Sequence, residues 1–447
     1  MPLMKIIKIA FILGNLNFIG WLGIAILAIR EKEKTAARRS LLLACLSALP
    51  FWMTPILPDT IQSVWSVGLL ALTGIFIGIL FFPVRAKSNF VQNIPDSHRF
   101  DERETMFSRA ELRPGSAEYD HYYRNYPGHK APDDRFRQKP GLLSPDARFF
   151  HLEYFSEARY LFDQIAAQRD GVDGPVTPQK RSISPENATQ TLKIKILQSG
   201  AHSVGITRLK PYHLYSVSGQ GDRYGLPIDL SHRFAITFTV EMDFDAVAHA
   251  PKAPAVTESA RQYLNSGQIA LEIAREIRSW GYAARAHIDG NYLLICPLVA
   301  RDAGLGEIGR MGLLLTPKLG PRVRIAVVTT DLPLIKDTYT PDPSVEDFCR
   351  KCKKCADNCP ANAIPKGKRE TLHGLQRWKI NDVHCYTYWC AVGTDCARCM
   401  RVCPYSHPNT FFHNVIRFGI RHFPVFRRFA LQMDNLLYGK YPKPRSF

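Results

Sequence analysis

The sequence predicts an α+β core that follows an apolar helical region and precedes a small cysteine-rich domain. Three observations carry this prediction. Residues 1–87 contain three long apolar runs, residues 184–340 alternate between strand-like and helix-like patterns, and most cysteines lie near the C-terminal end. Alternating strand and helix patterns are typical of α/β and α+β domains. At 447 residues, the chain is long enough for two or three domains.

The apolar runs Ile6–Ile29, Leu41–Leu57 and Val64–Phe82 predict helices that cross a membrane. The first run carries no charge, and no small-x-small cleavage site precedes the charged residues after it. This pattern argues against a cleaved signal peptide. The loop after the first run is basic, whereas the loop before the third has no basic residue. Because basic loops stay in the cytoplasm, we expect the first loop to lie inside.

The second run decides on which side of the membrane the remaining chain lies. Leu41–Leu57 contains Pro50 and Pro55. If this run crosses fully, the third run returns the chain to the cytoplasm beside Arg85 and Lys87. If it only dips into the bilayer, the third run carries the chain outward. We expect the full crossing, which makes residues 88–447 cytoplasmic and the chain a multi-pass protein of the inner membrane.

Two regions with different composition follow the apolar runs. Residues 88–183 are rich in Arg, Asp, Tyr, Pro and Gly, and we expect one helix there, Phe149–Gln168, with the rest forming an extended arm or irregular packing. Residues 184–340 should form the α+β domain, whose first helix is capped by Ser184 and ends at Gly200. The further predicted elements are a helix at Glu258–Trp280 and strands at Ser203–Leu209, Phe234–Met242, Tyr282–Ile288, Tyr292–Cys296 and Val323–Thr329.

The cysteines near the C-terminal end follow a spacing that binds iron–sulfur clusters. Nine of the eleven cysteines lie between Cys349 and Cys403, which argues for metal ligation and against a disulfide framework. The run that begins at Cys349 and ends at Pro360 has the C-x2-C-x2-C-x3-C-P spacing of two-cluster bacterial ferredoxins. A zinc ribbon, the alternative for two CxxC pairs, explains neither the three-cysteine run nor the C-P endings. We therefore predict a ferredoxin-like domain with two [4Fe–4S] clusters at residues 341–410.

The spacing assigns seven cluster ligands and leaves one open. The ligands of the first cluster are Cys349, Cys352, Cys355 and Cys403. The second cluster takes Cys359, Cys396 and Cys399. Its fourth ligand is Cys385 or Cys390. We expect Cys385 to follow a short strand at Trp378–Val383 and Cys390 to begin a loop at Ala391–Asp395, and the spacing does not choose between them.

The chain is basic, with a formal net charge of +18 at pH 7. The basic residues are scattered, and no repeated aromatic platform or known binding module accompanies them, so we expect no nucleic-acid partner. Contact with anionic membrane lipids explains the charge, and we expect the basic tail 411–447 to lie on the membrane surface through its segment Phe411–Phe429.

A glycine-rich passage, A-G-L-G-E-I-G-R-M-G, lies at Ala303–Gly312 and contains a formal G-x-G-x-x-G match. The residues after it run towards a turn at Pro317 and Gly320 and do not predict the strand–turn–helix unit of a dinucleotide-binding fold. Glycines can, however, let the backbone approach a large flat cofactor.

Together these passages resemble one family, the corrinoid-dependent reductive dehalogenases, over about residues 98–445. Besides the glycine and cysteine motifs, the resemblance includes F-D-E-R-E-T-M-F-S-R at Phe100–Arg109, G-A-H-S-V-G-I-T at Gly200–Thr207, T-D-L-P at Thr330–Pro333, C-P-Y-S-H-P at Cys403–Pro408 and D-N-L-L-Y-G at Asp434–Gly439. It implies a nitroreductase-like core that binds cobalamin, two [4Fe–4S] clusters, and a distant relationship to epoxyqueuosine reductase. It also implies Cys385, within K-I-N-D-V-H-C-Y, as the open cluster ligand.

The resemblance further implies roles for individual residues. Tyr263, in S-A-R-Q-Y, corresponds to the family's proton donor, and Arg322, in G-P-R-V-R, to the arginine that stabilises its phenolate. A further polar residue of the site is expected at Asp289 or Asn291, with His287 and Arg324 as secondary candidates. The expected cobalamin contacts are Tyr212, His213, Tyr215, Gly304, Leu305, Gly306, Gly309, Gly312, Ser406 and His407.

The resemblance implies an oxidoreductase that removes halide from an organohalide by reduction, and the apolar runs predict that it is attached to the membrane. By the loop charges its catalytic domain would be cytoplasmic, and we expect it to take electrons from a ferredoxin, a flavodoxin or a quinol-linked reductase of the membrane. One alternative is a corrinoid iron–sulfur reductase of a non-halogenated substrate, such as an epoxide. The other is a membrane electron-transfer subunit, in which residues 100–340 only support a partner.

Overall fold

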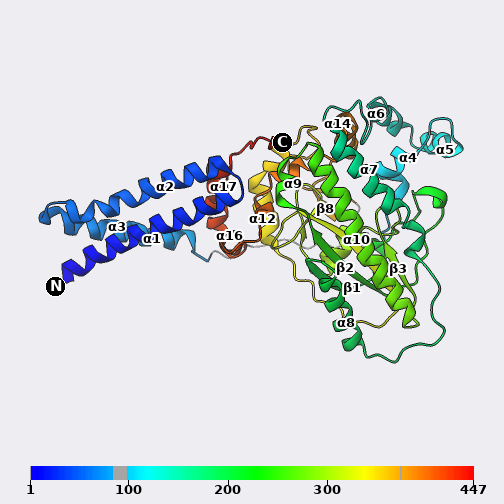
Figure 1. The fold of residues 1–447 in the computed structure, drawn as a ribbon, viewed down its shortest axis with the longest axis horizontal. Helices are drawn as coiled ribbons and strands as arrows, with labels where there is room; N and C mark the ends of the chain where they lie inside the picture. Colours follow the sequence, from blue (N-terminus) through cyan, green and yellow to red (C-terminus); the bar gives the residue numbers. More distant parts are fainter. Residues whose placement is uncertain (1, 84–97, 373–374, 447) are drawn as a thin grey trace. The chain divides into compact units, whose positions relative to one another are not determined.

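The computed structural model describes residues 2–83, 98–372 and 375–446 (Figure 1). The chain divides into two compact units. The first, which we call the apolar unit, contains Met1–Ser88 and Asn409–Pro442. The second, which we call the core unit, contains Asn89–Pro408 and Lys443–Phe447. The C-terminal helices thus pack with the N-terminal ones, a grouping that the sequence did not predict.

The apolar unit begins with three long helices, α1 (Pro2–Arg30), α2 (Lys34–Trp52) and α3 (Asp59–Leu80). A short 3₁₀ turn at Thr54–Ile56 follows α2. All three helices are long and apolar enough to cross a membrane. Many of their large apolar side chains are exposed, which suits helices whose outer faces meet lipid. The residues expected beside the third helix end, Arg85 and Lys87, lie outside the described residues.

Two further helices complete the apolar unit, α16 (Phe411–His422) and α17 (Pro424–Tyr438). Aromatic pairs attach them to α3. The rings of Phe81 and Phe423 lie 5.0 Å apart, and those of Phe76 and Phe429 lie 5.7 Å apart. The predicted tail is therefore a packed helical pair.

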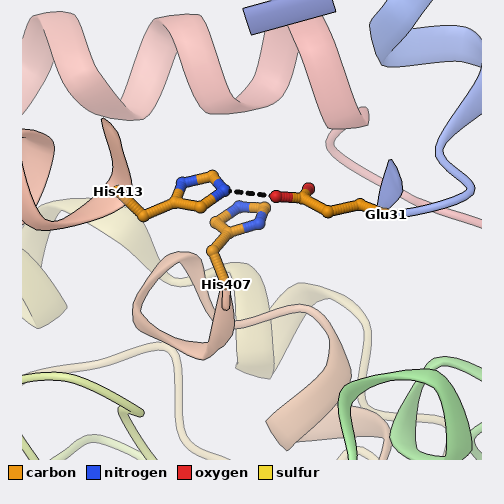
Figure 2. Close-up of side chains that lie close together, drawn as sticks. All are labelled: Glu31, His407 and His413. Atoms are coloured by element: carbon orange, nitrogen blue, oxygen red, sulfur yellow. Dashed lines mark hydrogen bonds and ion pairs between the residues drawn. The ribbon is translucent and has the colours of Figure 1, made fainter. Parts of the chain in front are cut away.

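Polar contacts fix the same pair to the first two helices. Figure 2 shows the carboxylate of Glu31, just after α1, paired at 2.6 Å with the imidazole of His413 on α16. The other oxygen of Glu31 accepts a hydrogen bond of 3.1 Å from the Tyr438 hydroxyl. Arg39 on α2 donates to the backbone carbonyl of Leu436 at 2.6 Å. These contacts satisfy Glu31, which is 5% exposed.

The core unit is built on an antiparallel sheet with strand order β1-β2-β6-β3. Its strands are β1 (Ser203–Arg208), β2 (Phe234–Glu241), β3 (Ala284–His287) and β6 (Val323–Thr330). Helices α8 (Pro185–Gln198) and α10 (Ala253–Ser279) bury their apolar faces in one cluster with the sheet. Ser184 caps α8, and Gly200 and Gly281 follow α8 and α10 in the left-handed conformation, so the local signals of the sequence hold here.

One predicted strand is wrong. Within Tyr292–Cys296, only Leu294 makes an isolated bridge, to Leu214, and helix α11 (Cys296–Asp302) begins at its end. The reason is Pro297, since proline is favoured in the first turn of a helix and cannot donate to a sheet. The glycine-rich passage after α11 forms a small hairpin of β4 (Glu307–Ile308) and β5 (Leu314–Leu315).

The region predicted as an extended arm is largely helical. It contains α4 (Met106–Glu111), α5 (Ala117–Asn125), α6 (Pro127–Arg137) and α7 (Leu152–Ala166). The short helices lack a long apolar period, so the sequence pattern did not predict them. Tertiary contacts hold them, chiefly the buried ion pair of 2.8 Å between Arg109 and Asp133. The predicted helix Phe149–Gln168 is present as α7.

The remaining elements are short and surround the cysteines and the sheet edges. They are α9 (Phe244–Ala248), α12 (Pro343–Cys352), α13 (Lys354–Asp357), α14 (Asp382–Val392), α15 (Arg398–Arg401), the hairpin β7 (Glu370–Leu372) and β8 (Leu375–Arg377), and 3₁₀ turns at Glu102–Glu104, Arg169–Val172, Pro211–His213, Gly221–Arg223 and Pro404–Ser406.

Candidate active site

The first group of cysteines lines one pocket. Its four members come from two distant points of the segment, three from α12 and α13 and one from the turn before Pro404. They are Cys349, Cys352, Cys355 and Cys403. Burial, together with the nearby thiols of Cys349 and Cys403, raises the pKa of Cys355 well above its usual range. Buried thiols this close together keep their protons until a metal binds and displaces them. The group therefore fits a [4Fe–4S] cluster.

The second group gathers around Cys385. Burial, together with the nearby thiols of Cys399 and Cys359, raises the pKa of Cys385 to about 12. Cys396, in turn, has Cys399 and Cys385 as its thiol neighbours. The four side chains therefore lie together, as the ligands of a second cluster must. This arrangement supports Cys385 as the open ligand.

Cys390 lies elsewhere. Its side chain packs against Met106 and Phe136 in a separate apolar cluster. Cys385 and Cys390 both lie on α14, and five residues of helix turn the chain by about 140°, so the two side chains leave the helix in different directions.

The strand expected at Trp378–Val383 and the loop expected at Ala391–Asp395 are corrected accordingly. Residues 378–381 form no strand, and helix α14 contains both Cys385 and Cys390. Cys390 therefore lies within a helix, and the loop begins only after it ends. The Asn381 side chain caps it by accepting a 3.0 Å hydrogen bond from the backbone of His384, and Gly393 ends it in the left-handed conformation.

A buried arginine beside the first group escaped the sequence analysis. Arg310, 1% exposed, lines the pocket of the first cysteines and donates to the carbonyls of Cys349 at 3.1 Å and Pro365 at 2.7 Å. Its guanidinium lies 4.4 Å from the ring centroid of Trp378. A fixed cation here would offset the negative charge of a thiolate-bound cluster. The only sequence signal was its place in the glycine passage.

Polar side chains surround Tyr263 on α10, and we call this group, with Ser259, Asp289, Arg324 and Asp395, the Tyr263 site. The guanidinium carbon of Arg324, on β6, lies 4.7 Å from the centre of the Tyr263 ring. This cation lowers the pKa of the phenol, but burial and the carboxylates of Asp289 and Asp395 outweigh it and leave the pKa raised. Tyr263 therefore holds its proton at neutral pH, beside a charge that would stabilise the phenolate.

Arg322 does not contact Tyr263 in this way. Its Nε donates to the Ser406 carbonyl at 3.0 Å, and its Nη1 pairs with Glu241 at 2.8 Å. Arg322 precedes β6 and its backbone N–H closes a turn onto Leu319, so its side chain does not follow the direction of the strand. We therefore replace Arg322 by Arg324 as the partner of the phenol.

Asp289 and Asn291 lie on the turn after β3 and differ in their surroundings. Burial raises the pKa of Asp289, which faces Arg169 at 3.8 Å. Asn291 accepts hydrogen bonds of 2.6 Å from Arg223 and from Arg285 at the same oxygen. The hydrogen bonds of Asn291 thus hold the turn, whereas the charge of Asp289 acts on the phenol of Tyr263.

His287 is fully buried and bonded on both ring nitrogens. Its Nε2 pairs with the Thr329 hydroxyl at 2.9 Å, and its Nδ1 accepts from the backbone of Leu293 at 3.2 Å. Burial lowers its pKa well below the usual range, so the ring is neutral. His287 is part of the sheet layer, and we no longer treat it as a candidate.

Two of the expected cobalamin contacts point inward. The Tyr212 hydroxyl donates to Asp302, and the His213 ring lies 3.1 Å from the same carboxylate. Although burial favours the neutral acid, the bond from His213 and the charge of Arg301 keep the pKa of Asp302 low. Tyr215 is half-buried instead, with its ring 6.2 Å from that of Tyr292.

Internal packing explains much of the glycine passage. A Cβ atom on Gly306 would lie 2.2 Å from the Leu315 carbonyl oxygen, and one on Gly309 would lie 2.6 Å from the Leu315 side chain. These two glycines are thus required by the β4–β5 hairpin itself. Ser406 donates to the Met400 carbonyl at 2.6 Å. The role of these residues towards a cofactor stays a prediction, as it does for Gly304, Leu305, Gly312 and His407.

One feature of the Tyr263 site fits a bound group that the chain does not supply. The Arg324 Nε and the Asp395 Oδ1 atoms are buried and have no hydrogen-bond partner among residues 2–83, 98–372 and 375–446. Buried polar atoms are nearly always bonded, so these two are available to a bound partner. The half-buried rings of Tyr215, Tyr263 and Tyr292 add the aromatic surface that suits a large flat cofactor.

The comparisons with known proteins find an iron–sulfur domain and similarity to reductive dehalogenases. A family model described as a 4Fe-4S dicluster domain matches residues 348–407. The tetrachloroethene reductive dehalogenase of Desulfitobacterium hafniense is 35% identical over 211 residues, which cover 45% of this chain and 38% of the relative. The enzyme of the same name from Sulfurospirillum multivorans is 30% identical over 291 residues, 57% of this chain and 58% of the relative.

A solved structure extends the similarity to the fold. The catabolic reductive dehalogenase NpRdhA, in complex with 3-bromo-4-hydroxybenzoic acid, matches with a TM-score of 0.64 and 26% identity. The match covers 80% of this chain and 49% of that chain. The chain spans only 38% to 58% of the length of the two curated relatives. The predicted α+β fold with a C-terminal dicluster domain and three apolar N-terminal helices is thereby confirmed.

Proposed function

Because the chain is a homologue of the reductive dehalogenases and carries a dicluster domain, we propose that it is a membrane-attached, cobalamin-dependent reductive dehalogenase. It would remove halide from an organohalide with electrons delivered through two [4Fe–4S] clusters. The observation that carries the proposal is Tyr263 beneath Arg324, whose carboxylate partner Asp395 directly precedes Cys396.

The position of the second cysteine group supports a direction of electron flow. Asp395, the residue before Cys396, is bonded to Arg324, so the second group adjoins the Tyr263 site. We therefore propose that electrons enter at the first group. The donor would be a ferredoxin, a flavodoxin or a quinol-linked reductase of the membrane.

The reaction needs two electrons and one proton, since R–X, two electrons and H⁺ give R–H and X⁻. Bound cobalamin would supply the low-potential electrons that break the carbon–halogen bond, and Tyr215, Tyr292 and the Ala303–Gly312 hairpin are the residues proposed to hold it. Tyr263 would donate the proton from its hydroxyl oxygen. Arg324 would stabilise the phenolate that remains, because an adjacent cation favours the charged form.

The apolar unit would anchor the enzyme. Helices α1, α2 and α3 are proposed to cross the inner membrane three times, with lipid as their partner. The basic loop after α1 favours a cytoplasmic core unit, where clusters and corrinoid can be inserted without export of a folded enzyme.

Halide release by the reconstituted protein tests the function. The protein is loaded anaerobically with cobalamin and both clusters and assayed against a panel of aryl and alkyl halides. Tyr263→Phe should keep both cofactors and lose activity by about 10²- to 10⁴-fold, the usual contribution of a general acid. Tyr160→Phe, at a tyrosine that is 62% exposed on α7, is the matched control.

Two outcomes would contradict the proposal. A Tyr263→Phe variant within a few-fold of the unchanged protein would mean that the proton comes from another group. A protein that takes up clusters and no corrinoid would favour the electron-transfer subunit, and turnover of an epoxide without halide release would favour the non-halogenated substrate.

A further inference from the structure

Arg324 is held between two sets of groups. On one side its guanidinium lies over the Tyr263 ring, 4.7 Å from the centroid. On the other side its Nη2 pairs with the Asp395 carboxylate at 2.9 Å and also donates to the Ser259 hydroxyl. Ser259 in turn donates to the same oxygen of Asp395. The three groups form a closed polar network against one face of the tyrosine.

The network joins three separate parts of the core unit. Ser259 and Tyr263 lie four residues apart on α10, which places them on the same face of the helix. Arg324 comes from β6, and Asp395 from the loop between α14 and α15. Ser259 is fully buried, and the Arg324 and Asp395 side chains are only 12% and 13% exposed. In such surroundings, one uncompensated charge would act strongly on its neighbours.

Asp395 belongs to a loop whose backbone is firmly held. The Thr394 hydroxyl donates to the Pro251 carbonyl at 2.7 Å and accepts from the backbone of Cys396 at 3.2 Å. Cys396 and Ala397 both adopt positive φ angles, 61° and 51°. This loop thus presents Cys396 to the second cluster group and the Asp395 carboxylate to Arg324.

Four titratable groups from the elements around Tyr263 act on its hydroxyl. They are Arg324 on β6, Asp289 after β3, Asp395 in the α14–α15 loop and the Cys296 thiol on α11. Arg324 favours the phenolate, whereas Asp289 and Asp395 favour the neutral phenol. The balance between the arginine and the two carboxylates therefore sets how readily the phenol gives up its proton.

We propose that Asp395, supported by Ser259, is a positioning residue that offsets the charge of Arg324 and so sets the acidity of the Tyr263 hydroxyl. The same carboxylate links this balance to the second cluster, since Asp395 directly precedes Cys396. The inference rests on the proposed function, because it assigns Tyr263 the role of proton donor.

Opposite shifts in the titration of Tyr263 test the proposal. The phenol is titrated by tyrosinate absorbance in the holoprotein, with Tyr263→Phe subtracted to isolate its signal. Asp395→Asn removes the negative charge and keeps the shape, so the midpoint should move down by about one pH unit. Arg324→Met should move it up. Glu157→Gln, which breaks the 2.5 Å pair of Glu157 with Arg261 on the outer side of α10, should leave it unchanged.

A second readout follows the cluster and needs no turnover. EPR-monitored redox titration should give a higher midpoint potential for the second cluster in Asp395→Asn, because a nearby negative charge is lost, and a lower one in Arg324→Met. If Asp395→Asn fails to retain both clusters, Ser259→Ala replaces it. That variant keeps both charges and loosens their pairing, so it should shift the phenol in the same direction as Asp395→Asn, by less.

The outcomes separate this inference from the proposed function. If Asp395→Asn and Arg324→Met shift the phenol in the same direction, or if neither shifts it, Asp395 only holds the loop and the inference is overturned. If the shifts are opposite while Tyr263→Phe still releases halide, the charge balance stands and Tyr263 is not the proton donor.

Discussion

Residues 349–403, which hold the two cysteine groups, and the Tyr263 site lie side by side in the core unit. The fold brings their side chains together in different ways. The cysteines that form the two groups all come from residues 349–403, and short turns bring most of them together. In the Tyr263 site, Ser259 and Tyr263 come from α10, Asp289 from the turn after β3, and Arg324 from β6. Only the folded sheet and helices bring these groups into contact.

This difference predicts how substitutions in each region affect the protein. A cluster needs all of its ligands at once, so a variant there should lose a whole cofactor. The Tyr263 site holds several interacting charges. A variant there should therefore change the reaction rate and the pKa of Tyr263 gradually and leave the cofactors in place. Asp395 belongs to both regions, which makes it the point where the comparison is most sensitive.

The largest effect is expected at Cys385. Cys385→Ser should lose or convert one of the two clusters, because its thiol lies with Cys359 and Cys399, whereas Cys390→Ser should keep both. Iron content and EPR spectra of the two variants provide the measurement. Full cluster content in the Cys385 variant would remove that residue from the ligand set and reopen the place of Cys390.

The neighbouring arginines should differ in their effect on catalysis. Arg324→Met should lower halide release by about 10²-fold, the order seen when one stabilising donor of a developing anion is removed. It should also lower thermal stability, because the buried carboxylate of Asp395 loses its ion-pair partner. Arg322→Met should lose about 1–3 kcal/mol of stability, because it leaves buried carbonyl partners such as Ser406 unpaired, with an unchanged pH profile. Equal effects of both variants on the pH profile would contradict the replacement of Arg322 by Arg324.

Glu102, in the F-D-E-R-E-T segment, extends the comparison to the arm. Burial raises its pKa to about 7, against the hydrogen bond that it accepts from the Gly219 backbone at 2.8 Å. The folded state therefore binds a proton that the unfolded state has already released between about pH 4.5 and 7. Stability should fall as the pH rises through this window and level off above it.

Glu102→Gln should remove most of that pH dependence, which amounts to at most about 3 kcal/mol. Denaturant unfolding of the detergent-solubilised protein at pH 5 and pH 8 measures it. Glu118→Gln, on the exposed surface of α5, is the control. A variant whose stability depends on pH as steeply as the unchanged protein would exclude Glu102 as the titrating group.

The smallest effect is expected from protease added to intact spheroplasts. If Leu41–Leu57 crosses fully, the core unit is cytoplasmic and should stay uncut until the cells are lysed. Cleavage before lysis would mean that the second run only dips into the membrane. A periplasmic marker protein, cut in the same sample, controls for protease activity.

The sequence by itself determined what short-range patterns can specify. Apolar runs located the three membrane-type helices, and cap residues such as Ser184 and Gly200 set the ends of α8. Cysteine spacing predicted seven cluster ligands, and four of these cysteines line one pocket. Each of these depends on residues within a few turns of one another, whose relative positions follow from helix, strand and turn geometry.

Tertiary structure alone decided which distant side chains meet. It chose Arg324 over Arg322 at Tyr263, buried Arg310 beside the first cysteines, and packed α16 and α17 against α1–α3. It also stabilised the short arm helices through the Arg109–Asp133 pair. The physical reason is that a side chain's direction at the end of a strand or helix depends on the turn that precedes it and on the packing around it, and neither leaves a periodic trace in the sequence.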